Sequence, residues 1–436
     1  MNIIQLFILL IILFLFLLLL NNKKLLNLFV ISIIITYYLI SLSTLKVFFF
    51  VVWFFISIGI LLNYSKFSDE LILILINLFS IILIIINTNI LWLYLIIEIQ
   101  TFTLFILIAK NRENILSLES SVKYFILGAL SSGFYLLGVT FIFKFNLNLD
   151  LGFLWNLNFN SNIYIKLGYL LILISLFFKI AIFPLHFWIA DIYEGSDIKL
   201  ILLLSTLPKL GIIFILIHLI SNDSIILICS LLSVVVGSFG AFNQTKIKRL
   251  LAYSGISHLG FIVLGISLGS ELGYEPSMVY IIIYMFTTFS IILVFFLLNK
   301  NDIYIIDLGE LYYSSKIIGL TLIFLIFSLA GIPPLLGFLS KFFIISILLS
   351  NNFIISCIIL IIFSILSISY YLRVVKILYF QENKSFLVFK KILKPNNKLN
   401  YLNLIFINFI FFISTIFIFN PNSLLLLCNL SLKSVY

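Results

Sequence analysis

Four ionisable side chains stand inside long apolar runs, where a charge is costly. They are Glu98 in LWLYLIIEIQTFTLFILIAK, Lys179 in SLFFKIAIFPLHFW, Lys209 in LLLSTLPKLGIIFILIHLI and Lys341 in AGIPPLLGFLSKFF. An ionisable group at the centre of a bilayer costs about 2.5–3.5 kcal/mol on insertion scales, and such groups mark proton and ion pathways. A carboxyl group and three amines can pass protons with only side chains and ordered water between them. We therefore predict that these four residues translocate protons.

Three prolines lie close to two of these charges. Pro184 follows Lys179 by five residues, and Pro333 and Pro334 precede Lys341. Proline lacks a backbone N–H and clashes with the preceding helical turn, so it frees carbonyl groups. Free carbonyls at membrane depth are tolerated only beside protein or water. The two helices are therefore predicted to be broken where a charge needs a polar, hydrated surrounding.

The order of the four groups suggests a path. A carboxylate near a buried amine favours its charged form, so Glu98 close to Lys179 would hold the Lys179 proton in place. If Glu98 moved or were neutralised, Lys179 could pass its proton toward Lys209, and Lys341 offers the next stop. The alternative for Glu98 is a protonated side chain that only makes a helix contact.

Other ionisable residues are weaker candidates for a proton relay. Lys209, one of the four main candidates, could instead extend its amine to a nearby membrane–water interface. Lys123 lies near the start of an apolar segment and could extend its amine to the basic side of the membrane. His186 and His258 lie close to helix breaks or ends, where a hydrogen-bonded structural histidine is equally expected. His218 could extend a polar path or cap the far end of its helix.

The composition requires a membrane to position these residues. Of 436 residues, 63% are hydrophobic and 10% are charged, whereas soluble domains contain about 25% charged residues. The apolar runs are about 20 residues long and do not alternate, so they predict helices and not barrel strands. Hydropathy gives about fourteen transmembrane helices, at the ranges 3–20, 25–43, 46–62, 71–87, 89–109, 121–143, 163–192, 199–220, 224–242, 250–268, 277–298, 316–349, 353–379 and 402–420.

The distribution of basic residues orients these helices. Loops after odd-numbered segments carry fifteen Lys and Arg, against four on the other side. Such a bias places the basic loops on the cytoplasmic or matrix side. The net charge of +10 is thereby explained by orientation, and basic residues scattered over short loops do not predict nucleic acid as a partner.

The two broken segments are the seventh and the twelfth. Because five is odd, the units that contain them point in opposite directions, which is typical of inverted-topology repeats. We therefore expect three N-terminal helices in 1–68, a first five-helix repeat in 69–222 and a second, inverted repeat in 223–380. A linker and a C-terminal transmembrane helix are expected in 381–436.

Binding motifs for redox groups and metals are not found. The cysteines Cys229, Cys357 and Cys428 are far apart, each in an apolar run, and their spacing does not suggest a metal or iron–sulfur site. GxGxxG and GxxxxGK are absent from the sequence, so a nucleotide site is not expected. The chain is predicted to hold no cofactor and no metal of its own.

Four segments resemble a known family. ESSVKYFILGALSSGFYLLGVTFIF, FKIAIFPLHFWIADIYEGS, AFNQTKIKRLLAYSGISHLGFIVLG and LAGIPPLLGFLSKF are similar to segments of the antiporter-like membrane subunits of respiratory complex I, the NADH:quinone oxidoreductase, in their chain 2 or subunit N form. The resemblance covers roughly residues 90–380. It implies a proton channel built from two inverted five-helix repeats.

The resemblance also implies roles and partners. It matches the carboxylate of the fifth span to Glu98, and the lysines of the seventh, eighth and twelfth spans to Lys179, Lys209 and Lys341. It implies no redox chemistry in this chain, with NADH, FMN, iron–sulfur clusters and quinone bound by other subunits. Expected partners are the other membrane-arm subunits, including neighbouring antiporter-like subunits, and membrane lipids.

Two alternatives and two locations stay open. The same fold serves a cation/proton antiporter subunit, and a membrane-arm scaffold that does not pump is a third reading, which the four titratable groups disfavour. The chain is rich in residues with A/T-rich codons, with 48 Phe and, by count, 23 Lys against 3 Arg. That bias favours an organelle genome and the mitochondrial inner membrane, with a bacterial plasma membrane as the alternative.

Overall fold

The protein is a bundle of helices in every part of the chain that can be described. The computed structural model describes residues 44–61, 69–145, 149–151, 163–220, 223–296, 303–309, 316–380 and 421–432. Ten helices within these ranges are long and apolar enough to cross a membrane. The predicted all-α polytopic membrane fold is therefore confirmed. The predicted segments 3–20, 25–43 and 402–420 lie outside the described residues, so the number fourteen stays a prediction.

Hydropathy located the unbroken helices to within a few residues. Their bounds are α3 (Thr44–Leu61), α4 (Asp69–Ile86), α5 (Ile90–Ile108), α6 (Ile115–Phe145), α10 (Ile198–Leu219), α11 (Ser224–Phe242), α12 (Ile247–Ser267), α13 (Glu271–Phe296) and α17 (Ile354–Phe380). The largest difference is at the start of α6 and of α13, each six residues earlier than expected. The two extensions, ILSLES and ELGYEP, contain serine, glutamate, glycine or proline, which lower the local hydropathy.

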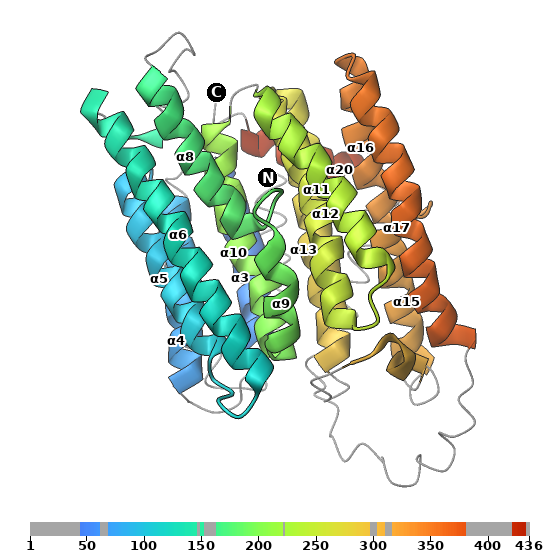
Figure 1. Ribbon diagram of the computed structural model, residues 1–436. Helices are drawn as coiled ribbons and strands as arrows, with labels where there is room; N and C mark the ends of the chain where they lie inside the picture. The colour runs from blue at the N-terminus through green and yellow to red at the C-terminus, as the bar shows by residue number, and fades with distance from the viewer. Residues whose placement is uncertain are drawn as a thin grey trace, which may run out of the picture.

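The two proline-containing segments each form a pair of shorter helices. The first pair is α8 (Ile163–Ile180) and α9 (Phe187–Gly195), and the second is α15 (Lys316–Ala330) and α16 (Leu336–Ser350). Figure 1 shows that α8 and α9 run down the view while α15 and α16 run up it. Two further short elements are the 3₁₀-helix η1 (Ile305–Leu308) and α20 (Pro421–Leu432).

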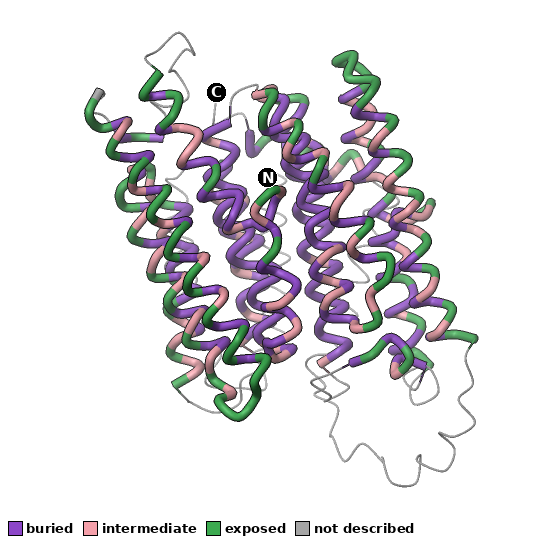
Figure 2. The backbone as a smooth tube through the Cα atoms, in the orientation of Figure 1, coloured by how far each residue is buried: buried purple, intermediate pink, exposed green. Residues whose placement is uncertain are grey.

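The centre of the bundle is buried and apolar, as in a soluble protein, but its outer faces are apolar as well. Helix α10 is buried along almost its whole length, and α12 and α13 beside it are nearly as buried (Figure 2). The outer face of α5 exposes large apolar side chains such as Trp92 and Phe102. An exposed apolar exterior around a buried centre is what a bilayer as solvent allows, and it places the central helices out of reach of lipid.

One small backbone feature recurs in the two halves of the molecule. Asn89, just before α5, forms an antiparallel β-bridge with Asp150, which follows α6. Lys246, just before α12, forms the same bridge with Tyr304, which follows α13. In both cases the residue after each bridge partner donates its N–H to the residue before the other, at 2.9 to 3.1 Å. The start of the second helix is thus tied to the end of the third in each half.

Helices α6 and α8 approach each other most closely at two glycines. A Cβ atom at Gly138 would lie 2.6 Å from the Gly168 carbonyl oxygen, and one at Gly168 would lie 2.7 Å from the Gly138 carbonyl oxygen. Small residues let helix backbones meet in membranes, where packing drives association in place of the hydrophobic effect. This crossing therefore sets the position of α8, which carries Lys179.

We predict that Gly138→Ala destabilises the protein, because neither backbone at the crossing can move away from the added methyl group. The expected loss is about 1–3 kcal/mol, as for other overpacked cores. The midpoint of denaturation in an SDS titration of the purified protein measures it. Gly133→Ala is the matched control on the same helix, because nothing lies within 4 Å of the added atom. Equal stability of the two variants would contradict the prediction.

Candidate functional site

The first helix break lies directly after Lys179. Helix α8 ends at Ile180, and Ala181 adopts a left-handed conformation with φ of 65°. The Ile182 N–H then donates to the Phe177 carbonyl at 3.0 Å, which closes a Schellman motif. Pro184 lies between α8 and α9, at the break that the sequence predicts, and α9 begins three residues later.

The second break has the same geometry. Helix α15 ends at Ala330, and Gly331 takes the left-handed conformation with φ of 82°. The Ile332 N–H donates to the Phe327 carbonyl at 3.3 Å. Pro333 and Pro334 follow, and α16 begins at Leu336. Each break therefore satisfies the last carbonyls of one helix locally and leaves the chain free to restart.

Glu98 and Lys179 form the first pair of ionisable groups. Glu98 lies on α5, half-buried, and its carboxylate interacts electrostatically with the Lys179 ammonium on α8. The Thr101 hydroxyl donates to Glu98 Oε2 at 3.2 Å. Glu98 Oε1 and Lys179 Nζ are buried and have no hydrogen-bond partner in the described part of the chain. The pair is thus close enough to sense each other's charge without a fixed hydrogen bond.

Lys209 lies at the centre of the bundle. Its side chain is buried, with only 2% of the residue exposed, although the sequence also allowed it to reach an interface. Its Nζ lies 5.8 Å from the ring centre of Tyr193 on α9 and 5.9 Å from that of Tyr284 on α13. Aromatic faces attract cations at such distances, so two rings from different helices surround this ammonium.

His258 lies between Lys209 and Lys341. It is buried on α12, and its charge would interact electrostatically with both lysines. Its two ring nitrogens contact the hydroxyls of Tyr280 on α13, at 2.8 Å, and Tyr371 on α17, at 3.1 Å. Both ring nitrogens are therefore hydrogen-bonded. This geometry is compatible with either role that the sequence left open for His258, a structural histidine or a proton relay.

Lys341 sits against the second break. Its Nζ donates to the carbonyl of Ala330, the last residue of α15, at 2.8 Å and to the Ser367 hydroxyl of α17 at 3.3 Å. The ammonium also lies 5.9 Å from the Phe261 ring centre on α12. A carbonyl at the end of an interrupted helix thus accepts a hydrogen bond from a buried lysine.

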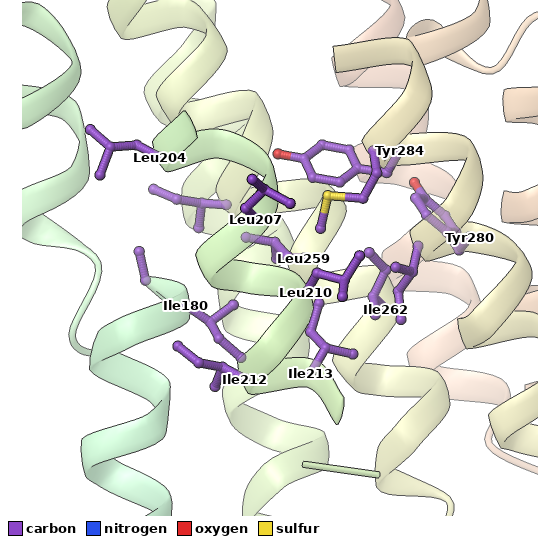
Figure 3. Close-up of a cluster of buried hydrophobic side chains, with 14 of the residues drawn as sticks. Ile180, Leu204, Leu207, Leu210, Ile212, Ile213, Leu259, Ile262, Tyr280 and Tyr284 are labelled. Carbon is purple, nitrogen blue, oxygen red and sulfur yellow. The ribbon is translucent and has the colours of Figure 1, made fainter. Parts of the chain in front are cut away.

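The four predicted residues fall into two groups. Glu98 interacts electrostatically with Lys179, and His258 interacts electrostatically with both Lys209 and Lys341. Figure 3 shows apolar side chains of α8, α10, α12 and α13 packed together in this region, with Ile180 and Leu210 among them. Within the described residues, no hydrogen bond or ion pair joins Lys179 to Lys209.

The remaining candidates lie elsewhere. His186 is buried in the first break, where its ring stacks between Phe183 and Phe187. His218 bonds the carbonyl of Phe214 on its own helix, with an Nδ1 to oxygen distance of 3.0 Å. His218 thus bonds within its own helix, and neither histidine contacts the four central groups through a described interaction.

Lys123 belongs to a network of ion pairs that the sequence did not reveal. Its Nζ lies 2.7 Å from both Glu119 and Asp191, and Asp191 and Glu194 of α9 also pair with basic residues of α12. The available signal for this network was that Asp191 and Glu194 follow a helix break and lie three residues apart, so they share one helix face. The tyrosines around Lys209 and His258 gave none, because the chain has 21 tyrosines and their partners are distant in sequence.

Comparison with known proteins agrees with this architecture. The family described as "NADH:quinone oxidoreductase/Mrp antiporter, TM" matches residues 87–368. NADH-ubiquinone oxidoreductase chain 2 of Metridium senile is 36% identical over 357 residues, covering 80% of this chain and 92% of the relative. NADH-quinone oxidoreductase subunit N of a Wolbachia strain from Brugia malayi is 34% identical, covering 71% of this chain and 70% of the relative.

A solved structure shows the same fold. A chain of respiratory complex I from Thermus thermophilus aligns with a TM-score of 0.69 and 25% identity, over 78% of each chain. The protein is therefore a multi-pass membrane protein of the antiporter-like class. It belongs to the NADH:quinone oxidoreductase/Mrp antiporter transmembrane family, as the resemblance of its motifs predicted, and the relatives it matches include chain 2 and subunit N proteins.

The two breaks allow a matched test of the left-handed residues. Gly331→Ala should destabilise, because a non-glycine residue in this conformation costs about 1–2 kcal/mol and the new Cβ would lie 2.9 Å from Lys341 Cδ. Ala181→Gly should stabilise by about 1 kcal/mol, because it removes the same steric cost at the other break. Denaturation midpoints in SDS measure both, and shifts in the same direction would disagree with this account.

Proposed function

We propose that this chain is a proton-translocating membrane-arm subunit of respiratory complex I, coupled to NADH:quinone electron transfer in other subunits. The observation that carries the proposal is the arrangement of buried ionisable groups on five different helices, α5, α8, α10, α12 and α16. Three of them, Lys209, His258 and Lys341, are at most 6% exposed and are not paired with a carboxylate in the described structure. Such costly groups persist where they serve a pathway.

The geometry supports a lateral path for protons. Neutralising Glu98 would remove its attraction for the Lys179 ammonium and let Lys179 release its proton. Ordered water would have to connect Lys179 with Lys209, because apolar side chains occupy much of the region between α8 and α10 (Figure 3). Lys209 is held by aromatic rings and not by a salt bridge, which leaves its proton exchangeable with His258. From His258 the charge can reach Lys341.

We also propose the unit boundaries expected from the sequence, 69–222 and 223–380, as two inverted repeats. The equivalent bridges at Asn89 and Lys246, the equivalent breaks at Ala181 and Gly331, and the opposite directions of the broken helices support them (Figure 1). Under this division Glu98 and His258 lie on the second helix of their units. Each of these residues then neighbours the lysine of its own broken helix.

The partners follow from the relatives, and the location is argued from the composition. Their names describe subunits of NADH oxidoreductases, so we propose that neighbouring antiporter-like subunits pack against this chain and that the redox groups belong to other subunits. The exposed apolar faces of α5 and α17 are available for such subunits or for lipid. The excess of residues with A/T-rich codons favours the mitochondrial inner membrane over a bacterial plasma membrane.

A cation/proton antiporter subunit is the second candidate, because the matching family includes Mrp antiporters. The two functions differ in what drives them. A complex I subunit should pump protons when NADH reduces quinone, with no requirement for Na⁺ or K⁺. An antiporter subunit should lose its proton flux when both cations are withdrawn from proteoliposomes, and that result would favour the second candidate.

We predict that Glu98→Gln and Lys179→Ala leave the complex assembled but reduce coupled electron transfer. Each variant removes one titratable group of the first pair, and loss of a proton-transfer group typically costs about tenfold or more. The measurement is NADH oxidation with quinone, together with the number of protons moved per electron in proteoliposomes. Lys316→Ala is the control, because this exposed lysine begins α15 far from the pair in sequence. Normal proton yield in both variants would refute the assigned roles.

The role of His258 can be separated from its hydrogen bonds. His258→Gln can still bond Tyr280 and Tyr371 but cannot take up a proton at neutral pH. We expect the variant to assemble normally and to pump at a rate reduced by about tenfold, as for removal of a proton relay. A purely structural histidine predicts the opposite, because Gln would then retain pumping and His258→Phe alone would impair assembly.

A further inference from the structure

The ion pairs around α9 form a network that links three helices at the basic side. Lys123 of α6 contacts Asp191 Oδ2 at 2.7 Å, and Arg249 of α12 contacts Asp191 Oδ1 at 3.1 Å. Arg249 also lies 3.0 Å from Glu194 Oε2, and Lys246 lies 2.6 Å from Glu194 Oε1. Every oxygen of the two α9 carboxylates therefore faces a different nitrogen, and the cations come from both sides of α9.

Helix α9 depends on these contacts for its position. It has only nine residues, it follows the break at Ala181–His186, and so short a helix is marginal without tertiary packing. Beyond the two carboxylates, Lys248 Nζ donates to the Ser196 carbonyl at 2.7 Å. Gly195 packs so closely on α6 that a Cβ atom would clash with the Leu116 carbonyl oxygen. The helix is thus clamped between α6 and α12 at its C-terminal end.

The same helix carries the ring that covers Lys209. Tyr193 lies between the two carboxylates in sequence, is 2% exposed, and its ring centre is 5.8 Å from Lys209 Nζ. At 100° per residue Tyr193 points about 200° away from Asp191 and about 100° away from Glu194. The carboxylates contact cations of α6 and of the start of α12, while the tyrosine ring lies over Lys209 of α10. A shift of α9 would therefore move the ring relative to the buried ammonium.

We propose that Asp191 and Glu194 are positioning residues for proton transfer through Lys209. They do not touch the proton path themselves. Their ion pairs hold α9 in the register that places Tyr193 against Lys209, and the broken helix gives α9 the freedom that makes such a clamp necessary. This role rests on the proposed function, since Lys209 must transfer protons for its surroundings to matter.

The test compares variants that remove the two carboxylates with a variant that exchanges Asp and Glu and keeps both negative charges, all in the assembled complex. Asp191→Asn, Glu194→Gln and their combination should assemble, because partly exposed ion pairs contribute little to stability one at a time. Coupled proton pumping per assembled complex should fall about threefold in the combined variant, as expected when a supporting contact shifts a conformational population. The exchange variant Asp191→Glu/Glu194→Asp keeps both carboxylates and should retain most pumping. Glu70→Gln is the matched control, because its 2.5 Å pair with Lys110 lies at the same side but does not involve α9.

A mutant cycle identifies the route of the effect. Tyr193→Ala should lower pumping by a similar factor, and adding it to Asp191→Asn/Glu194→Gln should lower pumping little further, because both changes act on the same ring. Two outcomes would overturn the positioning role alone. In the first, the losses from Tyr193→Ala and from Asp191→Asn/Glu194→Gln multiply when the variants are combined. In the second, Asp191→Asn/Glu194→Gln pumps normally while Lys209→Ala is impaired. Normal pumping in Lys209→Ala would instead overturn the proposed function and this role with it.

Discussion

A helix that stops inside hydrocarbon leaves carbonyl groups that must find a donor, and this constraint organises the centre of the protein. At the second break the Lys341 ammonium supplies one, with its Nζ 2.8 Å from the Ala330 carbonyl. At the first break the Trp188 indole N–H donates to the Phe178 carbonyl at 2.9 Å, while Lys179 is left without a fixed hydrogen bond. The same backbone device thus holds one lysine firmly and leaves the other responsive to Glu98.

The ionisable groups are separated into two environments with different tasks. At the basic side, Asp191, Glu194 and their cations are paired and partly exposed, so they fix helices relative to one another. At the centre, Lys209 and His258 are buried among tyrosine rings. The paired charges hold helices together, and under the proposed function the charges with neutral or aromatic partners exchange protons. Helix α9 takes part in both environments, because its carboxylates and Tyr193 lie on different faces.

The repetition of backbone features explains how a lateral path can exist in a bundle of vertical helices. In the proposed division, two units of opposite direction each contribute a broken helix, and each break lies beside a lysine, Lys179 or Lys341. Helix α10, buried along its length, and α12 lie between the two breaks and supply Lys209 and His258. A path across the bundle therefore needs no continuous polar helix face.

The sequence by itself determined the class of fold, the helix positions and the two breaks, because hydropathy and proline act locally along the chain. It also singled out Glu98, Lys179, Lys209 and Lys341 as candidates, since a charge inside an apolar run is visible without a structure. Only the tertiary structure decided which groups meet. The pairing of Glu98 with Lys179, the place of His258 between two lysines, and the ion pairs of α9 join residues that are 49 to 83 positions apart in the sequence. Such contacts depend on helix rotation and crossing, which are set by close packing at sites such as Gly138 and Gly168 and leave no periodic trace in the sequence.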